Sequence, residues 1–366
     1  MRNITVMIKP ASGRCDLRCK YCFYHDITEK RSIKNYGMMD RETAEIIIKR
    51  VMEERIQSCC FAFQGGEPLL RGLDFFRYFV ETVRSCNKKN IEVRYAIQTN
   101  GMHLNEEWAE FFRKNQFLVG ISLDGPAEIH NQMRVDVDGK GTYGKVRSAC
   151  GLLARYGVPY NILCVVTSVS ARYGMKVYEY CKKQNFSHIQ FIPCMEPFGE
   201  ERGAYALSCQ AYEGFLKTVF DLWFQDFQKG NYISVRHIDN YLSVLAGEVP
   251  ELCTMKERCS CQFAVEADGS VYPCDFYMTD EWRLGNIKDE SWSGMRSGET
   301  AEKFIAGSVL GEACLKCEWR LVCKGGCRRD REAGQNIFCE SYKGFFEYAI
   351  DRLEIAAMAF KGQAFI

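Results

Sequence analysis

The sequence predicts an α/β protein in which a partial (β/α)6 barrel is followed by a cysteine-rich domain. Short apolar runs alternate with longer amphipathic stretches up to about residue 235. This alternation is typical of a parallel sheet covered by helices, and repeated right-handed crossovers close such a sheet toward a barrel. After about residue 235 the apolar runs shorten and Cys, Gly and Trp become frequent. We therefore expect a barrel domain at 1–235, a connecting helix at 236–250 and a second domain at 251–366.

The individual elements follow from the hydrophobic pattern. Six short apolar runs are expected to be strands: 4–10, 60–64, 93–99, 117–124, 160–167 and 189–194. Helical periodicity is found between them in 40–55, 73–86, 105–115, 143–157 and 171–185. In the first of these helices Asp40 can cap the N-terminus, and Ile46, Ile47 and Val51 are expected to form the apolar stripe. A TIM-like barrel of this kind builds its active site at the C-terminal ends of the strands.

Composition excludes several classes of partner. Lys and Arg total 48 against 47 Asp and Glu, so no global charge attracts nucleic acid or anionic lipid. No apolar run has the length of a membrane span, and the N-terminus does not read as a signal peptide. The chain has 20 cysteines, and a protein in the reducing cytoplasm should not carry ten disulfides. We expect a cytoplasmic monomer whose thiols bind metal or are buried, with no membrane or nucleic-acid partner.

The first cysteine cluster lies directly after the first predicted strand. Cys15, Cys19 and Cys22 are spaced by three and two residues. Three thiolates can hold three irons of a cubane and leave the fourth iron open for chemistry, although a zinc knuckle is an alternative. Polar, glycine-rich turns at 64–68 and 98–101 follow the next two strands and should lie at the same edge. The first of these turns offers a backbone edge for a ligand's amino group.

These motifs together resemble the radical S-adenosylmethionine (SAM) superfamily over residues 4 to about 235. The resemblance implies that SAM chelates the open iron through its amino and carboxylate groups. An electron from the cluster would then cleave SAM to methionine and a 5′-deoxyadenosyl radical, which takes a hydrogen atom from the substrate.

The C-terminal region holds enough cysteines for two further cubanes, at positions 253, 259, 274, 314, 317, 323, 327 and 339. Spacing alone serves two structural Zn(Cys)4 sites equally well. After a radical SAM barrel, however, the segment resembles a SPASM domain. The resemblance assigns one auxiliary [4Fe–4S] cluster to Cys253, Cys259, Cys274 and Cys327. It assigns the other to Cys314, Cys317, Cys323 and Cys339. Basic residues around Cys327 would either offset cluster charge or form a solvated surface: Lys324, Arg328, Arg329 and Arg331.

Longer motifs narrow the resemblance to the anaerobic sulfatase-maturating enzymes; they span 21–25, 63–68, 98–101, 161–168, 271–277, 282–287 and 323–329. Such enzymes oxidise a Cys or Ser in a sulfatase motif, Cys/Ser-x-Pro-x-Arg, to Cα-formylglycine. The resemblance implies three [4Fe–4S] clusters, SAM and an external one-electron reductant of the flavodoxin or ferredoxin type. It places in the SAM site Tyr21, Gly65, Gly66, Glu67, Ser122, Arg134 and Met195, where the family carries Leu at the last position.

The expected partner is an unfolded sulfatase segment, because a folded sulfatase buries the target residue. Tyr24 and Gln64 are candidate contacts to this peptide. Asp275 follows Cys274, so the chain sets a carboxylate beside a cluster that can accept an electron. An ordinary Asp is ionised at neutral pH, and Asp275 is therefore the candidate general base.

Two other functions remain open from the sequence. One is a SPASM enzyme that cross-links a peptide through thioether or C–C bonds, and the other is a zinc-stabilised binding module without catalysis. The sequence does not distinguish a Cys-type from a Ser-type substrate.

Overall fold

The computed structural model describes residues 3–199 and 202–360. It divides into two compact units, each assembled from separate stretches of chain. Unit 1 comprises Met1–Ser122, Asn131–Tyr160 and Ser260–Ala306. Unit 2 comprises Leu123–His130, Asn161–Cys259 and Gly307–Ile366. These units combine separate stretches of chain, whereas the sequence predicts consecutive domains. The domain boundaries expected at 235 and 250 therefore remain a prediction.

Unit 1 is built on a sheet in the order β10-β9-β8-β1-β2-β3-β4. Its long strands are β1 (Asn3–Ile8), β2 (Ser58–Phe63), β3 (Glu92–Thr99) and β4 (Phe117–Ser122). The short ones are β8 (Ala264–Val265), β9 (Ser270–Tyr272) and β10 (Gly285–Asn286). The strands β1 to β4 are parallel, and β8 adds to the free side of β1, also in parallel. Part of the cysteine-rich region therefore belongs to the same sheet as the first strand.

The register of these strands brings the predicted loops to one edge. Ile8 pairs with Phe63, Phe63 with Ile97, and Ile97 with Val119, and this row of side chains is buried. The loops that follow β1, β2 and β3 consequently leave the sheet on the same side.

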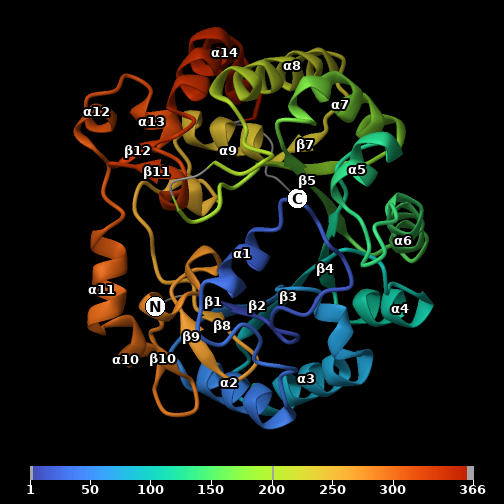
Figure 1. The fold of residues 1–366 in the computed structure, drawn as a ribbon, viewed down its shortest axis with the longest axis vertical. Coiled ribbons are helices and arrows are strands. Elements are labelled where there is room, and N and C mark those ends of the chain that lie inside the picture. The colour runs from blue at the N-terminus through green and yellow to red at the C-terminus, as the bar shows by residue number, and fades with distance from the viewer. Residues whose placement is uncertain (1–2, 200–201, 361–366) are drawn as a thin grey trace. The chain divides into compact units, whose positions relative to one another are not determined.

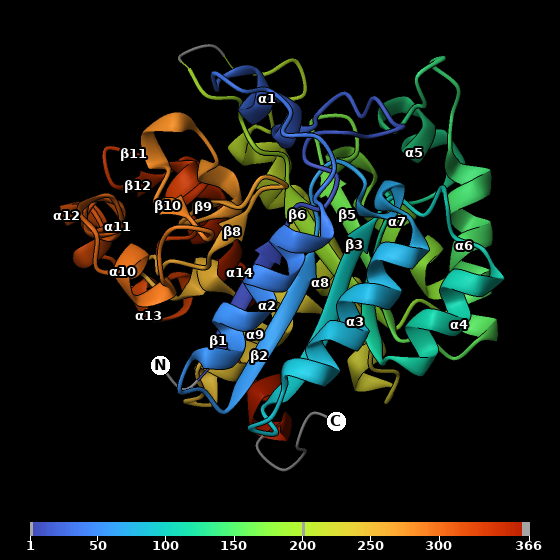
Figure 2. The same ribbon diagram turned by 90° about the horizontal axis from the view of Figure 1, so that it is seen from below.

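Unit 1 also contains several helices. They are α1 (Phe23–Glu29), α2 (Arg41–Glu53), α3 (Leu73–Cys86), α4 (Glu106–Lys114), α6 (Tyr143–Arg155), α10 (Trp292–Arg296) and α11 (Glu299–Ala306). Figure 2 shows α2 and α3 running along one face of β1 to β3. Asp40 caps α2 by accepting a hydrogen bond from the Thr43 amide at 2.7 Å, as predicted. The buried stripe contains Ile48 in place of the expected Ile46, because Ile48 shares one helix face with Ile47 and Val51.

Unit 2 contains β5 (Tyr160–Val166), β6 (His188–Pro193) and β7 (Ser234–Val235), which are parallel where they pair. Its helices are α7 (Gly174–Lys183), α8 (Cys209–Gln228), α9 (Arg236–Leu245), α12 (Glu312–Leu315), α13 (Arg320–Cys323) and α14 (Cys339–Phe360). The long helices α8 and α14 lie side by side (Figure 1). A small hairpin, β11 (Arg331–Glu332) with β12 (Gln335–Asn336), completes the unit, and α5 (Ala127–Met133) crosses the unit boundary.

All six predicted strands are present and the expected α/β class is confirmed. None of the described helices is long and apolar enough to cross a membrane.

Candidate active site and cluster ligands

The first cysteine cluster lies in the loop that leaves β1. Sγ of Cys15 accepts hydrogen bonds from the Leu17 amide at 3.4 Å and from Nδ2 of Asn100 at 3.8 Å. Nη1 of Arg134 lies 3.9 Å from Sγ of Cys19. Cys22 is exposed at the start of α1. Donors aimed at the sulfurs of Cys15 and Cys19 suit thiolates that bind iron, and with the exposed Cys22 they are the three expected ligands of an open cubane.

The glycine turn after β2 is clamped against this loop. The Gly66 amide donates to the Ser12 carbonyl at 2.9 Å, and the Glu67 amide donates to the Arg14 carbonyl at 2.7 Å. A Cβ atom on Gly66 would come within 2.0 Å of the Arg14 carbonyl oxygen. Only glycine fits at this position, and its closeness fixes the backbone immediately before Cys15.

Glu67 connects this turn to the turn after β3. Its Oε1 accepts from the Leu69 amide at 2.9 Å and from the Thr99 hydroxyl at 2.7 Å, while Oε2 accepts from the Asn100 amide at 2.7 Å. Burial raises the pKa of Glu67 to about 7. Both oxygens are thus engaged within the protein, and the expected contact of Glu67 with SAM stays a prediction.

Six of the seven expected SAM-site residues lie in unit 1. The Arg134 guanidinium lies 5.3 Å from the centre of the Tyr21 ring, and Nη1 of Arg134 lies 3.9 Å from Sγ of Cys19. Ser122 ends β4 and is buried. Met195 belongs to unit 2, where its carbonyl accepts from the Cys194 thiol at 3.8 Å.

The candidate base lies in unit 1. Asp275 opens a single 3-10 turn after Cys274 and is buried. Its Oδ1 forms an ion pair with the ammonium of Lys9, the residue that follows β1. Sequence reasoning treated Lys9 only as the end of a strand and missed this partner. The isolated lysine closing an apolar run was the one available signal.

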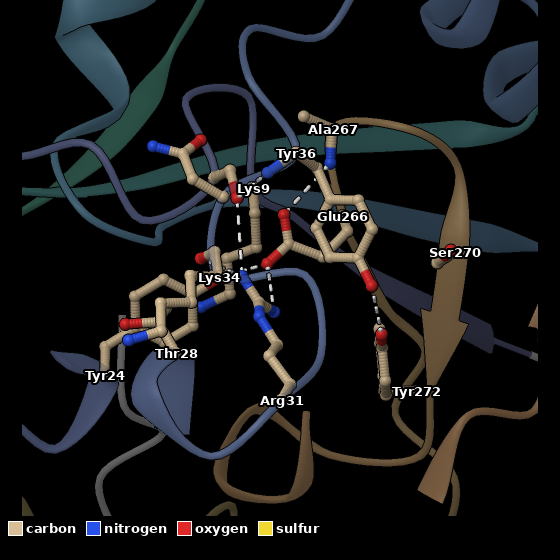
Figure 3. Close-up of polar contacts among 12 residues, drawn as sticks. Lys9, Tyr24, Thr28, Arg31, Lys34, Tyr36, Glu266, Ala267, Ser270 and Tyr272 are labelled. Atoms are coloured by element: carbon tan, nitrogen blue, oxygen red, sulfur yellow. Dashed lines mark hydrogen bonds and ion pairs between the residues drawn. The ribbon is translucent and has the colours of Figure 1, made fainter. Parts of the chain in front are cut away.

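Of the two candidate peptide contacts, Tyr24 is engaged inside the protein. Its hydroxyl donates to Glu266, which also pairs with Arg31 at 2.7 Å. Figure 3 shows Tyr24, Arg31 and Glu266 pointing toward one another. Gln64 follows β2 and is half-buried. Its backbone amide donates to the Ile8 carbonyl at 3.0 Å. Gln64 remains the better placed of the two to meet a ligand at this edge.

Four C-terminal cysteines line a single cavity in unit 2: Cys314, Cys317, Cys323 and Cys339. Aromatic side chains of Trp319, Tyr342 and Phe346 share the lining. Among the described residues, no three His, Cys, Asp or Glu side chains converge on a single metal ion. Four thiols around one cavity fit a four-iron cubane, whose ligands stand further apart than those of one zinc ion.

The other expected cluster draws on both units, so its geometry stays a prediction. Cys253, Cys259 and Cys327 belong to unit 2 and Cys274 to unit 1. Burial raises the pKa of the Cys259 thiol, and Arg328 and Arg331 oppose this rise. These two arginines are therefore placed to offset thiolate charge.

The remaining basic residues beside Cys327 point elsewhere. The Arg329 guanidinium lies 3.7 Å from the centre of the Phe198 ring, and Lys324 pairs with Glu257 at 4.0 Å. The suggestion that all four basic residues serve the cluster is not supported for these two.

Comparison with known proteins identifies the family. Residues 10–181 match the model of the radical SAM superfamily, and residues 253–318 match the SPASM iron–sulfur cluster-binding domain. A cysteine-type anaerobic sulfatase-maturating enzyme of Clostridium novyi (strain NT) is 47% identical over 366 residues, covering 98% of both chains. The chain belongs to the anaerobic sulfatase-maturating enzymes.

A second relative and a solved structure of the same family also resemble this chain. A serine-type anaerobic sulfatase-maturating enzyme of Bacteroides thetaiotaomicron is 30% identical over 376 residues, covering 95% of this chain and 89% of the relative. A solved structure, native anSMEcpe with bound AdoMet (SAM) and the Cp18Cys peptide, superposes with a TM-score of 0.94 at 47% identity. The superposition covers 98% of this chain and all of the other.

Family membership confirms several expectations. The protein is a radical SAM enzyme with the barrel and SPASM fold, and its cofactors are SAM and [4Fe–4S] clusters. It also excludes the zinc-stabilised binding module without catalysis.

Proposed function

We propose that this enzyme oxidises the cysteine of a sulfatase Cys-x-Pro-x-Arg motif to Cα-formylglycine. The observation that carries the proposal is full-length similarity: the relatives at 47% identity are cysteine-type enzymes, whereas serine-type relatives are 27–30% identical. A cysteine substrate is therefore favoured over serine, and both are favoured over peptide cross-linking.

The chemistry defines what the protein must supply. Converting a –CH2SH side chain to the thioaldehyde removes one hydrogen atom, one proton and one electron, and water then releases hydrogen sulfide to give the aldehyde. SAM and the iron–sulfur clusters supply the hydrogen-atom and electron acceptors when bound. The proton requires a base from the chain itself.

Asp275 is the proposed base. Its carboxylate is buried, and Lys9 engages only Oδ1. Within the described residues Oδ2 receives no hydrogen bond, so this oxygen is open to accept a proton. Its neighbour Cys274 is a proposed ligand of an auxiliary cluster, which brings proton and electron acceptors to the same stretch of chain.

Asp275→Asn tests this role. A positioned general base contributes about 10²–10⁴-fold in rate, so the variant should lose formylglycine formation by about that factor while retaining its clusters and SAM binding. A serine peptide is the stricter substrate, because a thiol with a pKa of about 8.5 loses its proton with less help. An Asn variant within threefold of wild type on the serine peptide would remove Asp275 from the mechanism.

The cofactor ligands are proposed as follows. Cys15, Cys19 and Cys22 hold the catalytic cluster, with Tyr21 and Arg134 beside SAM. The two auxiliary clusters take the C-terminal sets assigned above, giving three cubanes and about twelve irons per chain. An external flavodoxin- or ferredoxin-like protein supplies electrons to a monomeric enzyme. Iron analysis after anaerobic purification checks the cluster number.

The polypeptide partner is proposed to be an extended segment read through backbone hydrogen bonds and Gln64. Peptides of roughly 10–20 residues that carry the motif should then be sufficient substrates. Turnover of whole folded sulfatase but of no such peptide would contradict this.

A further inference from the structure

Lys9 is a buried cation whose position is fixed at both ends. Its side chain is 1% exposed, and its only ion-pair partner among the described residues is Asp275, whose side chain is 9% exposed. At the other end, the Lys9 amide donates to the Val265 carbonyl of β8 at 2.8 Å. Burying an ammonium is costly unless it is paired, so the geometry of this pair is strongly constrained.

The lysine stem is held between two further residues of unit 1. A Cβ built on Gly65 would lie 3.1 Å from Cδ of Lys9, so the stem passes directly along the glycine turn. The ammonium also lies 4.7 Å from the centre of the Tyr24 ring.

Contacts on its hydroxyl also fix the position of Tyr24. Its hydroxyl donates to Glu266, and Arg31 pairs with Glu266 with both side chains fully buried. Figure 3 shows Lys9, Tyr24, Arg31 and Glu266 gathered in this network. The ammonium is therefore set in place by a preorganised shell.

Stability does not account for such a pair. Buried ion pairs are often matched or surpassed by apolar side chains of similar volume, so the fold could be built without one. The pair does dictate which carboxylate oxygen is engaged and which remains open. A base must present its oxygen within hydrogen-bond reach of the departing proton, and this is a requirement of orientation.

We propose that Lys9 is a positioning residue for the reaction: its ammonium engages Oδ1 of Asp275 and so directs Oδ2 toward the substrate proton. This inference rests on the proposed function of Asp275 as the base. Lys9 touches neither substrate nor cofactor in the proposal and acts only through Asp275.

Lys9→Met replaces the cation by an apolar chain of similar length. Because a misplacement of about 1 Å can cost on the order of 10²-fold in rate, we expect kcat for formylglycine to fall by about 10–100-fold. The KM for the peptide and the rate of SAM cleavage should stay within about threefold of wild type. Lys9→Arg, which keeps the charge, is the second variant if Lys9→Met fails to fold, and it should retain more activity than any neutral replacement.

A double-mutant cycle separates positioning from a general structural role. In the Asp275→Asn background, adding Lys9→Met should change kcat by less than threefold, because the group through which Lys9 acts is already lost. Lys49→Met is the matched control: Lys49 is an exposed residue of α2 that pairs with Glu45 at 3.0 Å, and its loss should leave activity unchanged.

The outcomes distinguish the positioning role of Lys9 from the assignment of Asp275 as the base. If Asp275→Asn is impaired while Lys9→Met and Lys9→Arg match wild type, the Lys9 proposal is wrong and the base assignment stands. If losses from Lys9→Met and Asp275→Asn multiply, Lys9 acts independently and the proposal is equally overturned. If Asp275→Asn itself matches wild type, the base assignment and the positioning role both fail.

Discussion

Gly66→Ala should disable the catalytic cluster through a single methyl group. The added Cβ would lie 2.0 Å from the Arg14 carbonyl oxygen and 2.5 Å from the Arg14 carbonyl carbon. Both atoms are backbone, so no side chain can rotate away to relieve the contact. The φ angle of Gly66 is not in the left-handed region, which leaves the collision as the whole effect.

The size of the effect follows from the geometry. Before Cβ reaches an ordinary van der Waals distance, the two backbones must separate by about 1 Å. This shift would stretch the hydrogen bond from the Glu67 amide to the Arg14 carbonyl and displace Cys15. Overpacking of this kind costs about 1–3 kcal/mol in stability, and a 1 Å displacement at a reacting centre costs on the order of 10²-fold in rate.

The assay compares Gly66→Ala with Gly144→Ala after anaerobic reconstitution. Gly144 lies in α6 of the same unit, has no atom within 4 Å of a built Cβ, and should accept alanine without loss. Formation of 5′-deoxyadenosine from SAM should fall about 10²-fold in Gly66→Ala and remain normal in Gly144→Ala. Wild-type SAM cleavage by Gly66→Ala would show that the catalytic cluster does not require the close approach of the glycine turn to the cysteine loop.

Three further predictions address the clusters and the pH response. Replacing Cys15, Cys19 and Cys22 together by Ala should abolish 5′-deoxyadenosine formation while leaving the auxiliary clusters visible by EPR and Mössbauer spectroscopy; residual SAM cleavage would overturn the ligand assignment. Arg134→Met removes a cation 3.9 Å from Sγ of Cys19. Because a reduced cluster carries more negative charge, this loss should lower the midpoint potential of the catalytic cluster in an EPR titration. An unchanged potential would show that Arg134 does not stabilise the reduced cluster. Burial lowers the pKa of His237 from 6.5 to about 4, so protonation of the unfolded chain should cost about 2 kcal/mol of stability between pH 7 and pH 5. His237→Phe should flatten that dependence in urea unfolding, and an unaltered slope would contradict it.

The sequence predicted the long elements because their signals are local. Each of the six strands is an apolar run followed by a polar or glycine-rich turn, and the Asp40 cap needs only the amide three residues ahead. The same local reasoning placed the cysteine loop and the glycine turn at one edge of the sheet. It selected Ile46 in place of Ile48 because several consecutive apolar residues fit more than one helix face.

The contacts that sequence reasoning missed are long-range. Strands β8 and β10 have two residues each, too short for any periodicity, yet β8 joins the C-terminal region to β1. Lys9 and Asp275 are 266 residues apart, and only the folded sheet brings them together. A lysine that closes an apolar run signals a buried cation, but it does not identify the carboxylate that pairs with it.

The most direct test of the proposed function is anaerobic incubation of the reconstituted full-length enzyme with SAM, a reductant and matched peptides that differ only in Cys or Ser at the target position. Mass spectrometry should show replacement of –CH2SH by –CHO in the cysteine peptide, faster than the corresponding oxidation of the serine peptide, with 5′-deoxyadenosine formed alongside. A cross-linked peptide with no aldehyde, or SAM cleavage that leaves both peptides unchanged, would contradict the account.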